Sequence, residues 1–211
     1  MKNVTDRTSN PFGMEPACKR FVPGYGDANA EFHIIGDHPG VHGGTDTGVP
    51  FTELPGSERL QSVLQSTGLL RATGDEPVVD RTFLSYLHMC VPNPGGTPSE
   101  ADYIDMERFF DAELRAIAAH VLFPVGERAT RHVLETYTAK APKTAIDMDR
   151  LHATELRGSG WLVMPIKEPA EWTDDDATRL ESAIETLRST DFRRETDLGR
   201  FIAGSDPYYV R

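Results

Sequence analysis

The sequence predicts an α/β protein, a three-layer α/β/α sandwich around a central, mostly parallel, four-stranded sheet. Short apolar runs that suit buried strands alternate along the chain with longer segments whose apolar residues recur at helical spacing. Residues that end strands and cap helices, chiefly Gly, Pro, Ser and Thr, separate these segments. Because regular strand–helix alternation builds parallel sheets with helices on both faces, these observations favour the sandwich.

Four apolar runs provide the predicted strands. They cover residues 31–36, 81–89, 120–126 and 161–166. The first run, Phe32-His-Ile-Ile, stops at Gly36, and the third stops at Gly126 and turns straight into a helix. Continuous apolar runs of this length are typical of strands that are buried on both faces.

Four segments are predicted to be helices. The first begins at Ser57 and ends at Gly68, and the second follows a capping box with an early proline, Thr97-Pro-Ser-Glu100. The third covers residues 127–137, and the last begins at Thr173, just before a run of aspartates that suits the helix dipole. Apolar stripes predict the buried faces, which include Leu60, Val63, Leu64, Tyr103, Met106, Phe110, Leu114, Ile117, Ala177, Leu180, Ile184 and Leu187.

One α/β domain is expected over residues 28–201. Residues 1–27 are polar and rich in Pro and Gly, which predicts an irregular N-terminal arm, and residues 202–211 read as an irregular tail. No apolar run approaches the ~20 residues that cross a bilayer, and the first residues lack the apolar core of a signal peptide. We expect a cytoplasmic protein that has no membrane partner and is a monomer.

The charge balance is strongly acidic, with a formal net charge of −11. An acidic surface argues against nucleic-acid binding, because phosphate contacts need local positive charge. A cytoplasm of high salt screens such a surface, so a halophile-like adaptation explains the same composition. The sequence leaves both interpretations open, and arginine, which suits phosphate contact, is its main cation.

Cys18 and Cys90 are the two cysteines of the chain. Two thiols are too few for a disulfide scaffold or for a metal site made of thiolates alone. We expect two reduced cysteines, at least one of them buried.

The polar turn Gly36-Asp-His-Pro-Gly40 is the strongest functional signal. It places Asp37 and His38 at the carboxyl end of a predicted strand, which is where open α/β sheets bind ligands. A carboxylate and an imidazole at that position are candidates for acid–base chemistry. The long Gly- and Pro-rich loop that follows, over residues 38–56, also suggests function or mobility.

The order of motifs resembles the uracil-DNA glycosylase superfamily, most closely its thermostable iron–sulfur branch. The branch motifs Gly-Glu-Ala-Pro-Gly and Gly-x-Pro-Phe resemble Gly36-Asp-His-Pro-Gly40 and Gly48-Val-Pro-Phe51. Its Asn-x-x-Lys-Cys-x-Pro-Pro segment is similar to Tyr86-Leu-His-Met-Cys-Val-Pro92, and its Pro-Thr-x-His-Pro-Ser motif falls on Pro165-Ile-Lys-Glu-Pro-Ala170. The resemblance covers residues 23–172.

The departures from this branch bear on its cofactor and its substrate. The branch holds an iron–sulfur cluster with four cysteines, whereas here Cys90 has a clear counterpart, Cys18 a weaker one, and Met106 stands about where the fourth falls. The sequence therefore predicts no cluster and no other cofactor or metal. Tyr86 replaces the asparagine that reads uracil, and Glu168 replaces the histidine of the last motif.

The resemblance implies a base-binding slot around Gly36, Pro39, Phe51 and Tyr86. Phe51 would stack on the flipped base, or it is a loop anchor packed into the core. Tyr86 would close the slot or bind a different base, or it is a buried strand residue. Asp37 would stabilise charge on the sugar and orient water, or it caps the turn, and the two roles can coexist.

A donor for the departing base is the other requirement of this chemistry. His38 is the best-placed candidate, since Asp37 can hold it charged. His42 and Lys167 are the other possible donors. A solvated loop histidine is the favoured interpretation of His42, and a phosphate contact is an equal alternative for Lys167. Glu168 could serve as a second catalytic acid, which would imply a different base or reaction.

The leading hypothesis is a DNA glycosylase that hydrolyses the bond between deoxyribose and uracil or another damaged base, with DNA as its partner. A catalytically impaired relative that binds nucleic acid or a nucleobase without cleavage is the first alternative. A hydrolase of small nucleosides is the second, and the acidic composition favours it if the surroundings are not saline.

Overall fold

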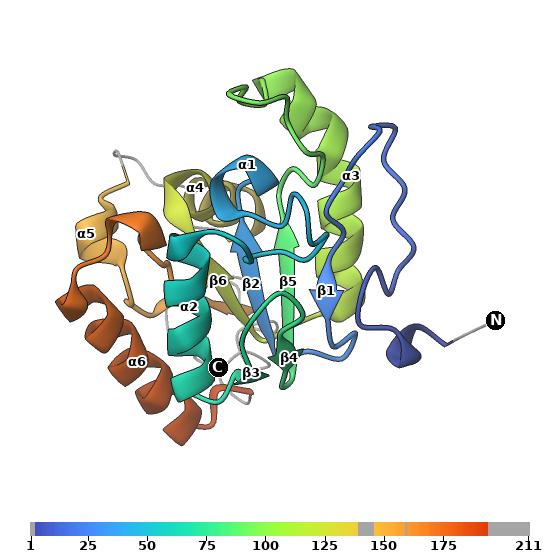
Figure 1. Ribbon diagram of the computed structural model, residues 1–211. Coiled ribbons are helices and arrows are strands. Elements are labelled where there is room, and N and C mark those ends of the chain that lie inside the picture. The colour runs from blue at the N-terminus through green and yellow to red at the C-terminus, as the bar shows by residue number, and fades with distance from the viewer. Residues whose placement is uncertain (1–2, 139–145, 159, 194–211) are drawn as a thin grey trace, which may run out of the picture.

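The computed structural model describes residues 3–138, 146–158 and 160–193. It confirms the three-layer α/β/α sandwich (Figure 1). Four parallel strands form the centre of the main sheet: β2 (Phe32–Gly36), β5 (Thr82–Tyr86), β6 (Val121–Pro124) and β8 (Trp161–Val163). Strand β2 lies between β5 and β6, and β8 pairs with β6.

The sheet has six strands, so the prediction of four was wrong. Strand β1 (Tyr25–Gly26) pairs antiparallel with β5 at one edge, and β7 (Leu156–Gly158) pairs antiparallel with β8 at the other. Both edge strands are too short to carry a recognisable alternation of apolar residues. A separate hairpin pairs β3 (Leu70–Ala72) with β4 (Val78–Val79).

Two pairs of long helices cover the two faces of the sheet (Figure 1). Helices α2 (Pro55–Ser66) and α6 (Asp174–Ser189) pack on the face that contains Ile34. Helices α3 (Glu100–Ile117) and α4 (Gly126–Tyr137) pack on the face that contains Ile35. Neighbouring residues of β2 therefore reach opposite cores, as the two-residue period of a strand requires.

Short helices complete the described chain. They are η1 (Val4–Asp6), α1 (Pro39–His42), α5 (Met148–Leu151) and η2 (Pro169–Glu171). Within the described ranges, every helix is too short or too polar to span a bilayer. The predicted tail, and the end of the predicted domain from residue 194, lie outside the described residues.

The helix caps and apolar stripes follow the sequence closely. Thr173 caps α6, as predicted, and it also forms a capping box with Asp176. The capping box of α3 is formed by Ser99 and Asp102, two residues beyond the predicted one. Most predicted stripe residues are buried, and Ala177 and Tyr103 are half-buried.

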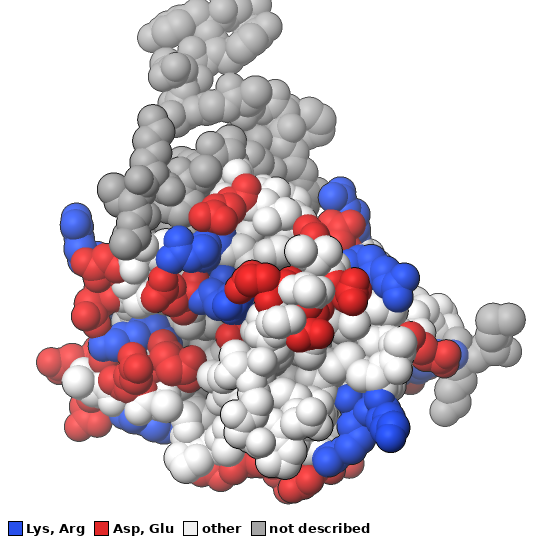
Figure 2. Space-filling view, turned by 90° about the horizontal axis from the view of Figure 1, so that it is seen from above, with Lys and Arg blue, Asp and Glu red and all other residues white. Residues whose placement is uncertain are grey.

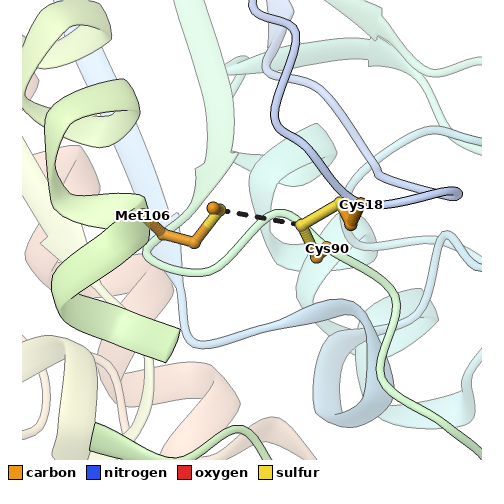
Figure 3. Close-up of a disulfide and its surroundings, with 3 residues drawn as sticks. All are labelled: Cys18, Cys90 and Met106. Carbon is orange, nitrogen blue, oxygen red and sulfur yellow. Dashed lines mark hydrogen bonds between the residues drawn. A yellow bond between two sulfur atoms is a disulfide. The ribbon is translucent and has the colours of Figure 1, made fainter. Parts of the chain in front are cut away.

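The two cysteines form a disulfide, so the prediction of reduced thiols was wrong (Figure 3). The arm turns back along the sheet through β1, and Phe21 pairs with Cys90 in an isolated bridge. This pairing brings the Cα atoms of Cys18 and Cys90 to 6.1 Å, within the range that a disulfide spans. Local sequence gives no sign of it, because 72 residues separate the two positions.

Removal of the α6 cap should weaken the fold measurably. The Thr173 side chain accepts a hydrogen bond from the backbone N–H of Asp176. Thr173→Ala should therefore lower the free energy of unfolding by about 1 kcal/mol, measured by urea denaturation. Thr178→Ala is the matched control, because this exposed threonine lies inside the same helix and should change stability by less than about 0.5 kcal/mol. Equal losses in both variants would contradict the capping role.

Glu113 should make stability depend on pH. This residue of α3 is fully buried, and burial raises the pKa of its carboxyl to about 8, from an ordinary value of 4.5. The folded protein therefore keeps a proton that the unfolded chain releases, so stability is lost as the pH rises through that interval.

Substitution of Glu113 by glutamine removes this loss of stability at high pH, because glutamine does not titrate. The melting temperature of Glu113→Gln relative to the wild type should rise between pH 4.5 and about pH 8, measured by thermal unfolding. Glu107→Gln, on the exposed side of the same helix, corrects for the loss of one negative charge. If the difference in melting temperature between Glu113→Gln and the wild type does not change with pH, the raised pKa of Glu113 is refuted.

Candidate active site at the carboxyl edge of the sheet

The four parallel strands end at one edge of the sheet, at the top of Figure 1, where α1 lies. Titratable side chains follow these strands. Asp37 comes directly after β2, His88 follows β5, and Glu168 follows β8 after a short loop. Arg128 lies in the first turn of α4, just beyond β6. The structure thus gathers these groups at the edge where α/β sheets bind ligands.

Asp37 is held by partners on two helices. The hydroxyl of Tyr103, from α3, donates a short hydrogen bond to its Oδ1 atom. The Nε atom of Arg128 lies 3.9 Å from its Oδ2 atom, and the Arg128 guanidinium lies 4.3 Å from the centre of the Tyr103 ring. The Asp37 side chain remains 19% exposed, so its carboxylate is positioned by the protein and open to solvent.

Tyr103 keeps its proton in this arrangement. Burial, together with its hydrogen bond to Asp37 and the charge of that carboxylate, raises the pKa of the Tyr103 hydroxyl far above its ordinary value. The hydroxyl therefore acts as a permanent donor toward Asp37. Arg128 also binds Glu100 through a contact of 2.9 Å, which anchors the guanidinium at the start of α3.

His38 is buried, and its surroundings favour the neutral imidazole over the charged form. Its Nδ1 atom accepts a hydrogen bond from the backbone N–H of Gly40 at 3.0 Å, which caps α1. Burial lowers the pKa of the imidazole and outweighs the opposing effect of Asp37. Because Nδ1 accepts this hydrogen bond, the ring proton of neutral His38 lies on Nε2.

His42 is buried, so the prediction of a solvated loop residue was wrong. It ends the one-turn helix α1, which folds the loop back over the strand ends. Its Nδ1 atom accepts from the backbone N–H of Asp37 at 3.1 Å, so Nε2 carries the proton and donates to Oε2 of Glu168 at 3.0 Å. His42 therefore connects the turn after β2 with the loop after β8.

Glu168 points into the site from the position of the branch histidine. Its side chain is 25% exposed, and its other oxygen, Oε1, has no hydrogen-bond partner among the described residues. A Cβ atom at Gly126 would lie 3.3 Å from Oε2, so the glycine leaves room for this carboxylate at the start of α4. The site therefore holds a second positioned carboxylate with a free oxygen.

The predicted base slot is filled by the rings that were expected to line it. Phe51 and Tyr86 are fully buried, and their ring centres lie 5.3 Å apart. The Tyr86 hydroxyl accepts from the backbone N–H of Phe51 at 2.7 Å and lies 3.0 Å from the carbonyl oxygen of His42. A Cβ atom at Gly36 would lie 2.7 Å from the Phe51 ring, so no space remains between them.

Lys167 and Pro39 lie beside the site, where one is paired with aspartates and the other begins a helix. The Lys167 ammonium is 2.6 Å from Asp149 and 3.8 Å from Asp176, so its charge is already paired. Pro39 occupies the first turn of α1, where its fixed backbone angle suits the start of a helix.

Glu53 organises the loop that carries Phe51. Its carboxylate accepts hydrogen bonds from the backbone N–H groups of Thr45, Asp46 and Thr47. Burial alone would raise the pKa of Glu53, but these donors outweigh it and lower the pKa. The Glu53 carboxylate therefore holds the loop over residues 44–53 together.

Two hollows flank the site. The Glu168 hollow, of about 300 Å³, lies between α1, the start of α2 and η2, and its walls include His42, Arg59 and Glu168. The disulfide hollow, of about 620 Å³, is lined by residues that include His88, Asp102 and the Cys18–Cys90 disulfide. Figure 2 looks onto this edge and shows acidic and basic groups interspersed, without a continuous basic surface over the described part of the face.

Several site residues were missed by the sequence analysis. Tyr103 was read as part of a core stripe, because helical spacing identifies a face and not the partner of a polar tip. The sequence offered one indication of Arg128, because this residue follows Gly126 at a strand-to-helix turn, and ligands bind at such turns. Nothing in the sequence indicates the contact between His42 and Glu168, which are 126 positions apart.

The chain is similar in sequence to uracil-DNA glycosylases. The chain is 23% identical over 176 residues to a type-4 uracil-DNA glycosylase of Saccharolobus solfataricus, a match that covers 83% of this chain and 74% of the relative. It is 32% identical to a type-5 uracil-DNA glycosylase of Thermus thermophilus and 30% identical to one of Pyrobaculum aerophilum. These two matches cover 49% and 55% of this chain, and about half of each relative.

A family match extends over most of the described chain. Residues 23–188 match the uracil DNA glycosylase superfamily, a span that contains all strands from β1 to β8 and all but the last residue of α6. It also contains Asp37, His42, Tyr103, Arg128 and Glu168. This chain belongs to the uracil DNA glycosylase superfamily.

Proposed function

We propose that this chain is a DNA glycosylase-type hydrolase that cleaves the N-glycosidic bond of uracil or another damaged base in DNA. The observation that carries the proposal is the Asp37 carboxylate, which lies partly exposed at the carboxyl edge of the sheet between Tyr103 and Arg128. Membership of the superfamily and the names of the relatives support the same reaction class. The proposed hydrolysis uses water and protein groups alone.

Asp37 would act on the sugar. Breaking the bond between base and deoxyribose builds positive charge on the sugar, and a fixed carboxylate stabilises that charge. The Tyr103 hydroxyl occupies one acceptor site on Oδ1, and the Arg128 guanidinium lies near Oδ2 at 3.9 Å, beyond hydrogen-bond distance. A carboxylate has about four acceptor sites, so Asp37 keeps the capacity to orient an attacking water.

His38 and Glu168 would act on the departing base. The ring proton of neutral His38 lies on Nε2, which suits hydrogen-bond donation to the negative charge that develops on the base. Glu168 has the opposite preference, because its free oxygen accepts hydrogen bonds. We therefore place the base in the Glu168 hollow, with a preference for bases that present N–H groups to this carboxylate.

DNA is the proposed partner, and the base must leave the helix stack to reach the hollow. Phosphate contacts would come from scattered arginines, since Lys167 is paired with aspartates and the described part of the face has no continuous basic surface (Figure 2). The net charge of −11 fits action in a cytoplasm of high salt, with the protein working as a monomer.

A superfamily member that binds a nucleobase or nucleic acid without cleaving it is the second candidate. One observation favours it: Tyr86 and Phe51 fill the space beside Gly36, in which the sequence analysis placed the base. The two candidates differ in one measurable respect, which is release of free base. Binding that saturates without any base release would select the second.

Asp37→Asn should remove the activity. Loss of the negative charge should lower the single-turnover rate of base release by about 100-fold or more, measured on uracil-containing single- and double-stranded oligonucleotides. Asp46→Asn is the matched control, because its carboxylate lies in the next loop with 89% of the side chain exposed, and it should keep the wild-type rate. Full activity in Asp37→Asn would remove this residue from the mechanism.

Glu168→His should increase uracil release. The substitution replaces a carboxylate that repels an anionic leaving group with a ring that donates to it, and one such donor is worth about 100-fold in rate. Glu171→His, on the exposed face of the neighbouring η2, should have no effect. A Glu168→His variant that is folded but slower than the wild type would instead show that the carboxylate itself takes part in the reaction.

A further inference from the structure

The Cys18–Cys90 disulfide ties the N-terminal arm to the segment that leaves β5. The sulfur of Met106, on α3, lies 3.7 Å from the Cys90 sulfur, and Figure 3 shows the side chains of Cys18, Cys90 and Met106 in one cluster. Apolar residues of the arm and of α3 surround it, among them Met14, Phe21 and Phe109. Cys18, Cys90 and Met106 therefore lie together in one small core between the arm, the β5 exit and α3.

This sulfur core does not fit the iron–sulfur cluster of the branch that the chain resembles. Such a cluster is held by four thiolates. The chain has two cysteines, and they are bonded to each other. Met106 supplies a thioether, which cannot provide the negative charge of a thiolate, so the donor set is incomplete.

We propose that the disulfide, packed on Met106, takes the structural place of the cluster and is a redox-sensitive tie that holds the arm against the Asp37 site. Backbone hydrogen bonds join the arm, just after Cys18, to the residues on either side of Cys90. Val91 donates its backbone N–H to Arg20, and Val22 donates to Met89. The register of the arm against the β5 exit is therefore centred on the bridge between Phe21 and Cys90, and the disulfide fastens its Cys90 end.

The same segment is bonded to the candidate active site. The backbone N–H of His88 donates to the carbonyl oxygen of Asp37 at 3.0 Å, and that of Leu87 donates to Gly36 at 2.9 Å. The His88 ring lies 5.5 Å from the ring of Tyr103, the donor to the Asp37 carboxylate. Release of Cys90 would thus loosen the segment that contains His88, which lies two residues before Cys90 and binds the backbone of Asp37.

Small thiols can reach this bond. The disulfide hollow, of about 620 Å³, opens on Cys18, Cys90 and Met106, and Cys18 is half-buried. Reduction by a dithiol transfers two electrons to the disulfide, gives two thiols in the protein and leaves the reductant as its own disulfide. Disulfides are rare in reducing compartments, so the state of this bond would report the redox balance around the protein.

Hydrogen exchange measured by mass spectrometry, with and without dithiothreitol, tests the tie directly. Reduction should speed exchange in residues 8–26 and 87–91 and leave β6 unchanged. It should also lower the melting temperature by about 10 °C, as expected for the opening of a loop of this length. The Cys18→Ser/Cys90→Ser double variant should match the reduced wild type and should not respond to dithiothreitol.

Three outcomes would overturn the proposal. The first is alkylation of two free thiols in the protein before reduction. The second is a reduced wild type with unchanged exchange and melting temperature, which keeps the test valid even if the double variant fails to fold. The third is tight binding of iron, with visible absorption, when the reduced protein is incubated with ferrous iron and sulfide without oxygen.

The link from the tie to catalysis rests on the proposed function, whereas the tie itself does not. If base release is found, dithiothreitol should slow it in the wild type and leave the double variant unaffected. Slower exchange of the arm in the oxidised protein, with no base release in either state, would support the tie and count against the glycosylase proposal alone. An equal rate in oxidised and reduced wild type would remove the link to the site.

Discussion

The register of β2 between β5 and β6 is the constraint on which the site depends. Gly36 at the end of β2 lies opposite Tyr86 at the end of β5, and Val125 continues the β6 pairing beside Ile35. All three strands therefore stop at the same level, and Asp37 emerges between α3 and α4. A shift of one residue would bury the Asp37 carboxylate or move it away from Tyr103 and Arg128.

Several differences from the branch motifs form one connected arrangement. The Tyr86 ring fills the space in front of Gly36, and its hydroxyl binds the backbone of Phe51 and His42. His42, fixed in this way, reaches Glu168. Tyrosine in place of asparagine and glutamate in place of histidine are thus linked through His42. The arrangement closes one space for a base and leaves another, the Glu168 hollow, beside a free carboxylate oxygen.

Local pattern predicted the parts of the fold that depend on local structure. The central strands, the turn at Asp37 and the long helices have clear periodicity or caps. The edge strands β1 and β7 were missed because two or three residues carry no period. The disulfide, the burial of His42 and the role of Tyr103 were missed because each depends on a contact between distant segments. Motif order pointed to this edge of the sheet as the candidate site, but it could not show that Phe51 and Tyr86 fill the expected slot.

The central claim is that this edge of the sheet releases a base from DNA. Its most direct test is mass spectrometry of the products formed with oligonucleotides that carry different damaged bases, at salt concentrations from low to molar. For a damaged base that presents N–H groups, each N-glycosidic bond that is hydrolysed should yield one free base and one abasic site. Intact oligonucleotides at every salt concentration, with folded and oxidised protein, would contradict the central claim.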